Sequence, residues 1–273
     1  RAWHDEPEPF CRDCHAPDSA GVVEPPTGAD ARWRAALDRG VGCLDCHADG
    51  DTIVTGPGSS QRAAPHALVR VDDFGTRSCA GCHEFDFPSY SRRPRGTMMQ
   101  TTMREHRSSL HAERSCADCH LPAGDHGLAS SREPAALRDA LTVSAARDHD
   151  TIVVSIAPQG IGHAFPTGDL FRRIAVELRG ADGQLLETIH LTRHFTGQRV
   201  GKGQVIKVER SDDRIGMGEG PRVVEFVVPV EHERDTLGWA LVHERAMEAA
   251  IGSEHDAEVW DRTTFASGTL ALP

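Results

Sequence analysis

Large aromatic side chains are scarce in this sequence of 273 residues. Only 5% of the residues are aromatic, a single one is tyrosine, and the hydrophobic fraction is a modest 38%. A chain of this length is expected to bury a sizeable core, yet it has little planar material with which to fill one. A bound planar group would supply the missing filling.

An excess of positive charge and long apolar runs are also missing. The formal net charge is −11, with 16 basic and 21 acidic residues in 1–140 and 14 and 20 in 141–273. Nucleic-acid binding needs a basic patch that replaces phosphate counterions, so we expect no nucleic-acid partner. No window reaches the 18 consecutive apolar residues of a spanning helix, which predicts no membrane span.

All eight cysteines belong to one repeated motif, Cys-x-x-Cys-His. The four copies consist, in order, of Cys11, Cys14 and His15; Cys43, Cys46 and His47; Cys79, Cys82 and His83; and Cys116, Cys119 and His120. In this motif the two thiols can add to the vinyl groups of haem while the adjacent histidine ligates the iron. The sequence therefore predicts four covalently attached haem c groups.

Disulfide bonds and zinc are the alternative uses of these cysteines. Four disulfide bonds would not explain a histidine directly after every second cysteine. Zinc sites pair two Cys-x-x-Cys knuckles or add a His-x-His element, and an immediately adjacent histidine is not typical of them. We therefore favour haem over both alternatives.

The texture of the chain predicts two regions, 1–140 and 141–273. The first holds the four motifs among loops rich in Pro, Gly and Ser, with helices expected over 29–39, 98–111 and 132–141. The second has expected strands over 151–157, 171–179, 184–192, 204–209, 222–229, 237–243 and 263–272, and residues 181–184 suit a tight hairpin turn. We expect an α+β protein, with a loop-rich, mainly helical tetrahaem region followed by a C-terminal β-sandwich domain.

The motifs resemble those of multihaem c-type cytochromes. Residues 11–120 carry this resemblance through the four Cys-x-x-Cys-His copies. A narrower resemblance covers about residues 97–230, where Met103–His111, Ser115–Pro122 and Gly162–Gly168 (GHAFPTG at 162–168) are similar to segments of multihaem cytochromes with a C-terminal β-sandwich. It implies haem attachment after export, hence a periplasmic or extracellular protein. A start at Arg1 fits an exported protein that has lost its signal peptide, and fits an expressed fragment equally well.

A second ligand on each iron would distinguish an electron carrier from a catalyst. Twelve histidines lie outside the motifs, so residue type alone is weak evidence. Four are expected to be ligands: His66, which precedes the third motif; His111, which precedes the fourth; His126, which follows it; and His163, in a glycine-rich loop that the β-sandwich domain contributes. The resemblance supports the last three.

Other residues stay open as ligands. His106 is displaced around the helix face from His111 and is expected on the surface or in packing. His4 is a reserve ligand, within its own chain or across an interface. Methionines 98, 99 and 103 could ligate iron, but their spacing favours packing. Six further histidines in or beside the expected strands are expected to be structural: His149, His190, His194, His232, His243 and His255.

Electron transfer is the function that this pattern predicts, with no catalytic residue. Four haems attached within about 110 residues must lie close together, which suits tunnelling between neighbours. The expected partners are redox proteins, or copies of the same chain in a head-to-tail extracellular filament. The alternatives are a soluble periplasmic carrier, a multihaem enzyme acting on a small nitrogen or sulfur compound at one open haem, and a docking module in the β domain.

Overall fold

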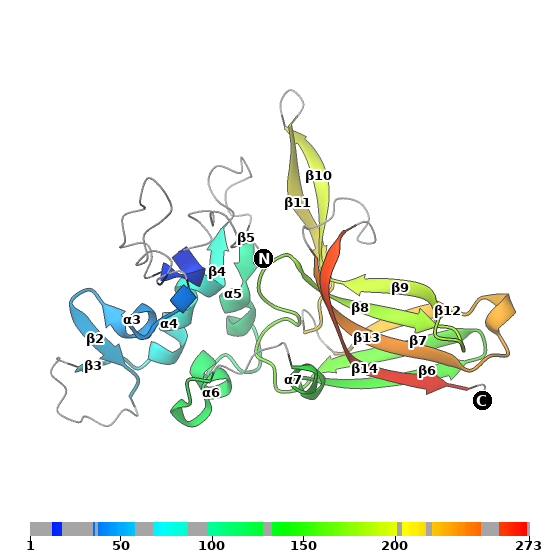
Figure 1. Ribbon diagram of the computed structural model, residues 1–273, viewed down its shortest axis with the longest axis horizontal. Coiled ribbons are helices and arrows are strands. Elements are labelled where there is room, and N and C mark those ends of the chain that lie inside the picture. Colours follow the sequence, from blue (N-terminus) through cyan, green and yellow to red (C-terminus); the bar gives the residue numbers. More distant parts are fainter. Residues whose placement is uncertain are drawn as a thin grey trace. The chain divides into compact units, whose positions relative to one another are not determined.

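The computed structural model describes residues 13–17, 35, 38–57, 68–86, 98–127, 133–200, 204–216, 220–246 and 257–271. The chain divides into two compact units, one formed by residues 1–88 with 114–127 and the other by residues 89–113 with 128–273 (Figure 1). The boundary expected at residue 140 stays a prediction. Within the described ranges, no helix is long and apolar enough to span a membrane.

The first unit is built from short helices and short strands. Its described helices include α3 (Cys43–His47), α4 (Phe74–His83), α6 (Cys116–His120) and the 3-10 turn η3 (Pro122–Gly124). Its small sheet contains β1 (Ala48–Asp49), β2 (Thr52–Thr55) and β3 (Leu68–Arg70), and β4 (Glu84–Asp86) follows α4. Strand β2 is antiparallel to β1 and parallel to β3.

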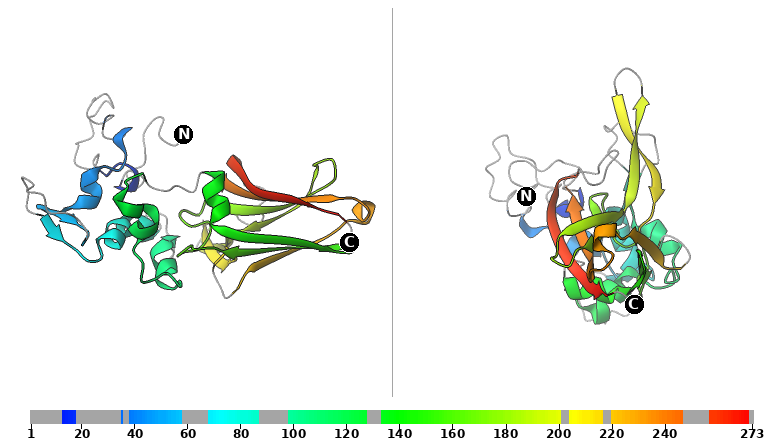
Figure 2. Two further views of the ribbon diagram at one scale, coloured as in Figure 1. Left: turned by 90° about the horizontal axis from the view of Figure 1, so that it is seen from below. Right: turned by 90° about the vertical axis from the view of Figure 1, so that its right-hand side faces the viewer.

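The second unit consists mainly of antiparallel strands in two sheets (Figures 1 and 2). It starts with β5 (Met98–Thr101), α5 (Thr102–Arg107) and α7 (Pro134–Asp139). One sheet has the order β12-β7-β6 and contains β6 (Leu141–Asp148), β7 (Thr151–Pro158) and β12 (Arg222–Val227). The other has the order β14-β13-β8-β9 and contains β8 (Arg172–Arg179), β9 (Leu185–Leu191), β13 (Leu237–Ala246) and β14 (Val259–Leu270).

Two further elements complete the second unit. Strands β10 (Arg193–Val200) and β11 (Gln204–Asp212) pair with each other in a separate antiparallel hairpin. This hairpin extends away from the two sheets (Figures 1 and 2). A 3-10 turn, η4 (Val230–His232), lies between β12 and β13.

The expected α+β fold with a mainly helical first region is wrong. Strands make up most of the regular structure, and helices α3 to α7 contain only five to ten residues each. Helices this short have little stability by themselves. The backbone between them must also form hydrogen bonds, and pairing in short strands provides these bonds. The helix expected over 98–111 illustrates this, because it begins as β5 and only Thr102–Arg107 is helical.

Alternating burial explains the strands. In β7, Ile152, Val154 and Ile156 are fully buried while the residues between them are partly exposed, which is the period of two expected of a sheet with one covered face. The seven strands expected in the C-terminal region correspond to β7, β8, β9, β11, β12, β13 and β14. Strands β6 and β10 were not expected.

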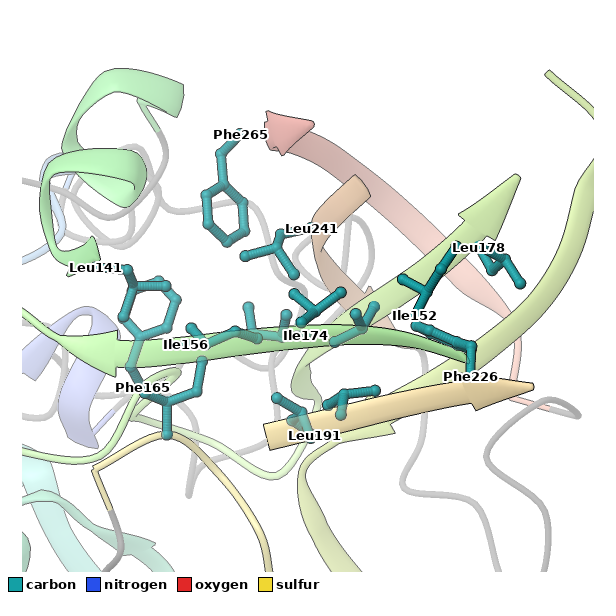
Figure 3. Packing of buried hydrophobic residues seen from close by; sticks show 14 of the residues in the cluster. Leu141, Ile152, Ile156, Phe165, Ile174, Leu178, Leu191, Phe226, Leu241 and Phe265 are labelled. Carbon is teal, nitrogen blue, oxygen red and sulfur yellow. The ribbon is translucent and has the colours of Figure 1, made fainter. Parts of the chain in front are cut away.

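One hydrophobic core lies between the two sheets (Figure 3). Ile152 and Phe226 reach it from one sheet and Ile174 and Leu241 from the other, and all four are fully buried. Burial of one such side chain contributes about 1.5–3 kcal/mol. Phe165 also belongs to this core, so the loop that contains it is anchored in the core.

The expected hairpin turn between β8 and β9 is confirmed. Gly183 has φ of 85°, a conformation that glycine adopts without strain. The Asp182 carboxylate accepts a hydrogen bond from the Gln184 amide over 2.9 Å. The Asp-Gly pair therefore specifies this turn locally.

Candidate functional site

Each described Cys-x-x-Cys-His motif lies in helical backbone. The second and fourth motifs are the whole of α3 and α6, and the third ends α4. Cys14 and His15 are also helical, whereas Cys11 lies outside the described residues. Positions i, i+3 and i+4 share one face of a helix, so both thiols and the imidazole of a motif project from the same side. Attachment of one haem requires this arrangement.

An aspartate inside the motif caps its own helix. In α6, Ser115 Oγ accepts from the Asp118 amide over 3.2 Å, and Asp118 Oδ2 accepts from the Ser115 amide over 2.7 Å. In α3, Asp45 Oδ2 accepts from the Gly42 amide over 2.5 Å. Such reciprocal caps satisfy amides that a helix start leaves unpaired. The third motif has Gly81 where the other two have the aspartate, and this motif forms the end of the longer helix α4.

The imidazole of His47 has a defined orientation. Its Nδ1 donates to the carbonyl of Val54 over 2.9 Å, because β2 returns alongside the motif. A carbonyl can only accept, so the lone pair of the neutral ring is on Nε2. Histidines that ligate metals through Nε2 are typically held by such a bond from Nδ1. His47 therefore fits the role expected of a motif histidine.

The cysteines of different motifs lie near one another in the first unit. A hydrogen bond to Cys116, followed by burial, raises the pKa of the Cys79 thiol. Burial, followed by the Asp45 charge, raises the pKa of Cys46. These shifts favour the neutral thiol over the thiolate. None of the seven described cysteines is in a disulfide bond.

Close packing of α4 on α6 brings the third and fourth motifs together. A Cβ on Gly75 would lie 2.8 Å from Ala117 Cβ and 2.9 Å from Ser115 Oγ, so glycine is needed for this approach. Thr76 Oγ1 accepts a hydrogen bond from the Cys116 amide over 3.4 Å. The spacing between these motifs is therefore set by a glycine outside both of them.

The predicted ligand His126 lies beside the second motif. Its ring centroid is 6.2 Å from that of His47, with the two planes tilted by 36°. Phe74 packs on the His47 ring, with the two ring centroids 4.8 Å apart. The structure thus brings together one motif histidine and one predicted distal histidine.

The predicted ligands His111 and His163 both belong to the second unit, where Gly162, directly before His163, packs against His106 and His111. The His163 Nδ1 donates to the Ala164 carbonyl over 2.9 Å, which leaves the ring lone pair on Nε2. A Cβ on Gly162 would lie 3.0 Å from His106 Cδ2 and 3.2 Å from His111 Cβ. His106 is only 8% exposed, so it is a packing residue rather than a surface one.

Glu105 joins helix α5 to loop 162–168. Its carboxylate accepts from Thr167 Oγ1 over 2.7 Å, from the Ala164 amide over 3.2 Å and from Arg214 Nη2 over 2.6 Å. Burial alone would raise the pKa of Glu105. The Arg214 charge and the hydrogen bonds from Thr101 and Thr167 outweigh burial and lower it, so Glu105 is a carboxylate.

Sequence reasoning missed Glu105 and Arg214. They are 109 residues apart, and no motif spacing connects them. The only local signal is that Glu105 lies in the Met103–His111 segment named above.

The remaining residues considered from the sequence either lie outside the described residues or have contacts away from the predicted ligands. His66, His4 and His255 lie outside the described residues. Met98 and Met99 lie in a strand, and their carbonyls accept hydrogen bonds from Arg193. Four of the histidines expected to be structural contact a carboxylate: His149, His190, His194 and His232. Among the residues with described positions, no three His, Cys, Asp or Glu side chains form a metal-binding group.

Comparison with known protein families, curated proteins and solved structures gives no match for this chain. The likeness to multihaem cytochromes therefore rests on the motifs quoted above.

Proposed function

We propose that this protein transfers electrons through four covalently attached haem c groups. The observation that carries the proposal is the repeated helical turn with two thiols and an imidazole on one side, seen in α3, α4 and α6. Haem bound there would supply a one-electron iron couple at each motif. The cysteines would hold it covalently and the motif histidines would ligate it.

The chain's own residues support this role at the second motif. Cys43 and Cys46 are one helical turn apart, and His47 is oriented by the Val54 carbonyl. A hydrogen bond from Nδ1 to a carbonyl increases the basicity of Nε2, which strengthens a ligand. The same logic applies to His163 and the Ala164 carbonyl.

The separation of His47 and His126 supports a shared iron. Two imidazoles that would hold one iron between them, each through a bond of roughly 2 Å, would have ring centroids about 6 Å apart. The centroids of His47 and His126 are 6.2 Å apart. We propose that His47 and His126 would together hold the haem of the second motif.

The location and partners follow from the same proposal. Haem attachment follows export in the cytochromes that the motifs resemble, so the protein is proposed to act in the periplasm or outside the cell. Its partners are proposed to be redox proteins or further copies of itself in a filament. His4, the residue expected to link copies, lies outside the described residues.

Mass spectrometry of the denatured protein tests the proposal. The intact mass should exceed the polypeptide mass by four haems, because thioether bonds survive denaturation. A variant with both Cys43→Ala and Cys46→Ala should carry one haem fewer. Haem that is lost in acidified organic solvent, or a chain without haem, would refute the proposal.

Spin-state spectroscopy tests the ligands. We expect four low-spin irons that do not bind carbon monoxide, with low potentials because histidine stabilises ferrous iron less than methionine does. His126→Ala should create one high-spin iron per chain. His149→Ala, which changes an exposed histidine paired with Asp148, should leave the spectrum unchanged. One high-spin iron in the unmodified protein would favour the enzyme alternative.

A further inference from the structure

A buried carboxylate and a buried guanidinium lie directly behind the loop that contains His163. Glu105 is 7% exposed and Arg214 is 3% exposed. Neither belongs to a haem motif or to the predicted ligands. We infer that Glu105 and Arg214 are positioning residues for His163, an inference that rests on the proposed haem function.

The hydrogen bonds of Glu105 tie two residues of the loop, both after His163, to α5. The Ala164 amide, directly after His163, donates to Glu105, and so does the Thr167 hydroxyl. Thr101, just before α5, donates to the same carboxylate over 2.5 Å. One side chain therefore bridges the loop and the helix that precedes His111.

Arg214 closes the same network from the other side. Its Nη1 donates to the Pro166 carbonyl over 3.1 Å, and its Nη2 donates to Glu105 over 2.6 Å. Asp212 holds the guanidinium in place through bonds of 3.0 Å to Nε and 2.7 Å to Nη2. Because the guanidinium is planar and its donors diverge, it can bind a carbonyl and two carboxylates at once.

The core supplies a second anchor for the loop. Phe165 pairs with Ile215 through two backbone hydrogen bonds of 2.8 and 3.0 Å. Its ring packs edge-on against Phe265, with centroids 6.1 Å apart. Phe165, two residues after His163, is thus held through both its backbone and its side chain, which restrains the loop close to the predicted ligand.

The network also carries charge. Glu105 and Asp212 are two carboxylates around the Arg214 guanidinium, so these three side chains together carry one excess negative charge. A fixed negative charge near an iron favours the ferric state and lowers its potential. Replacing Glu105 by neutral glutamine should therefore raise the potential of the haem that His163 ligates.

Two substitutions separate positioning from charge. Glu105→Ala removes both hydrogen bonds that Glu105 makes to the loop and should produce one high-spin iron per chain. Glu105→Gln keeps one acceptor oxygen, which can still accept from the Ala164 amide and the Thr167 hydroxyl, so all irons should stay low-spin while one potential rises. Glu177→Ala and Glu177→Gln are matched controls, since Glu177 is fully buried and paired with Arg179 and Arg262 on the four-stranded sheet. They should change stability but neither spectroscopic signal.

A double substitution identifies the ligand through which Glu105 acts. His163→Ala alone should give one high-spin iron, and adding Glu105→Ala should still give one, because both changes affect the same iron. Two high-spin irons in the double variant, or four low-spin irons in Glu105→Ala, would overturn the inference. If Glu105→Ala does not fold, an unchanged potential in Glu105→Gln would do so. Absence of haem from the unmodified chain would instead refute the proposed function.

Discussion

Gly75 lets the motif-bearing helices α4 and α6 approach more closely than a methyl group at this position would allow. The substitution Gly75→Ala would place Cβ 2.8 Å from Ala117 Cβ, about 1 Å closer than the 3.5–4.0 Å of an ordinary carbon contact. Backbone shifts that relieve such overpacking cost about 1–3 kcal/mol. Alanine also gains up to about 1 kcal/mol of helix propensity over glycine, which acts in the opposite direction.

Gly81→Ala isolates the steric effect. Gly81 lies in the same helix, α4, and a Cβ there would meet no atom within 4 Å. Both variants gain helix propensity, so the difference between them reports mainly the clash against α6. We expect Gly75→Ala to be less stable than Gly81→Ala by about 1–3 kcal/mol.

Hydrogen exchange followed by mass spectrometry is the suitable assay. A chain with two compact units need not unfold in a single step, so protection of α4 and α6 should be read locally. The expected difference corresponds to roughly fivefold to over a hundredfold faster exchange in Gly75→Ala. Equal exchange in the two variants would show that α4 and α6 do not pack as closely as described.

Two further predictions concern the second unit. Phe226→Ala should destabilise it by about 3–5 kcal/mol, because the side chain is fully buried between the sheets, whereas Val227→Ala, at a position that is 71% exposed, should cost under about 0.5 kcal/mol; exchange in β7 would measure both, and equal effects would contradict the assigned core. Burial, followed by the charges of Arg172 and Arg245, lowers the pKa of His243 from 6.5 to about 4. Between pH 6.5 and 4 the unfolded chain therefore binds a proton at His243 that the folded chain does not bind, so the free energy of unfolding should fall by up to roughly 3 kcal/mol as the pH drops through this range. The variant His243→Gln should lose this pH dependence of unfolding. An unchanged pH dependence in the variant would contradict the role of His243.

Local patterns were sufficient to predict most strands and the helical turns of the described motifs. The Cys-x-x-Cys-His spacing needs only one helical turn to place its side chains together, and the motif aspartates at positions 45 and 118 cap that turn themselves. The Asp-Gly turn before β9 is equally local. Strands with clear alternation, such as β7, are recognisable because a single period of two decides which side chains are buried.

The fold class was mispredicted because whether a short segment forms a helix or a strand depends on the segments that pack against it. Residues 98–111 have no glycine or proline and read as one helix, yet the first four form a strand. Strand β6 alternates small residues such as Ala145 with polar ones, and its pairing with β7 becomes evident only in the sheet.

What the sequence by itself determined is the set of groups that can react: eight cysteines and their adjacent histidines. In the second and fourth motifs the motif's own aspartate also caps the helical turn. Only the tertiary structure decided which distant residues meet, such as His47 with His126 and Glu105 with Arg214. The physical reason is that a turn or a helix depends on hydrogen bonds a few residues apart. A buried ion pair between residues 109 positions apart depends on how every intervening strand packs.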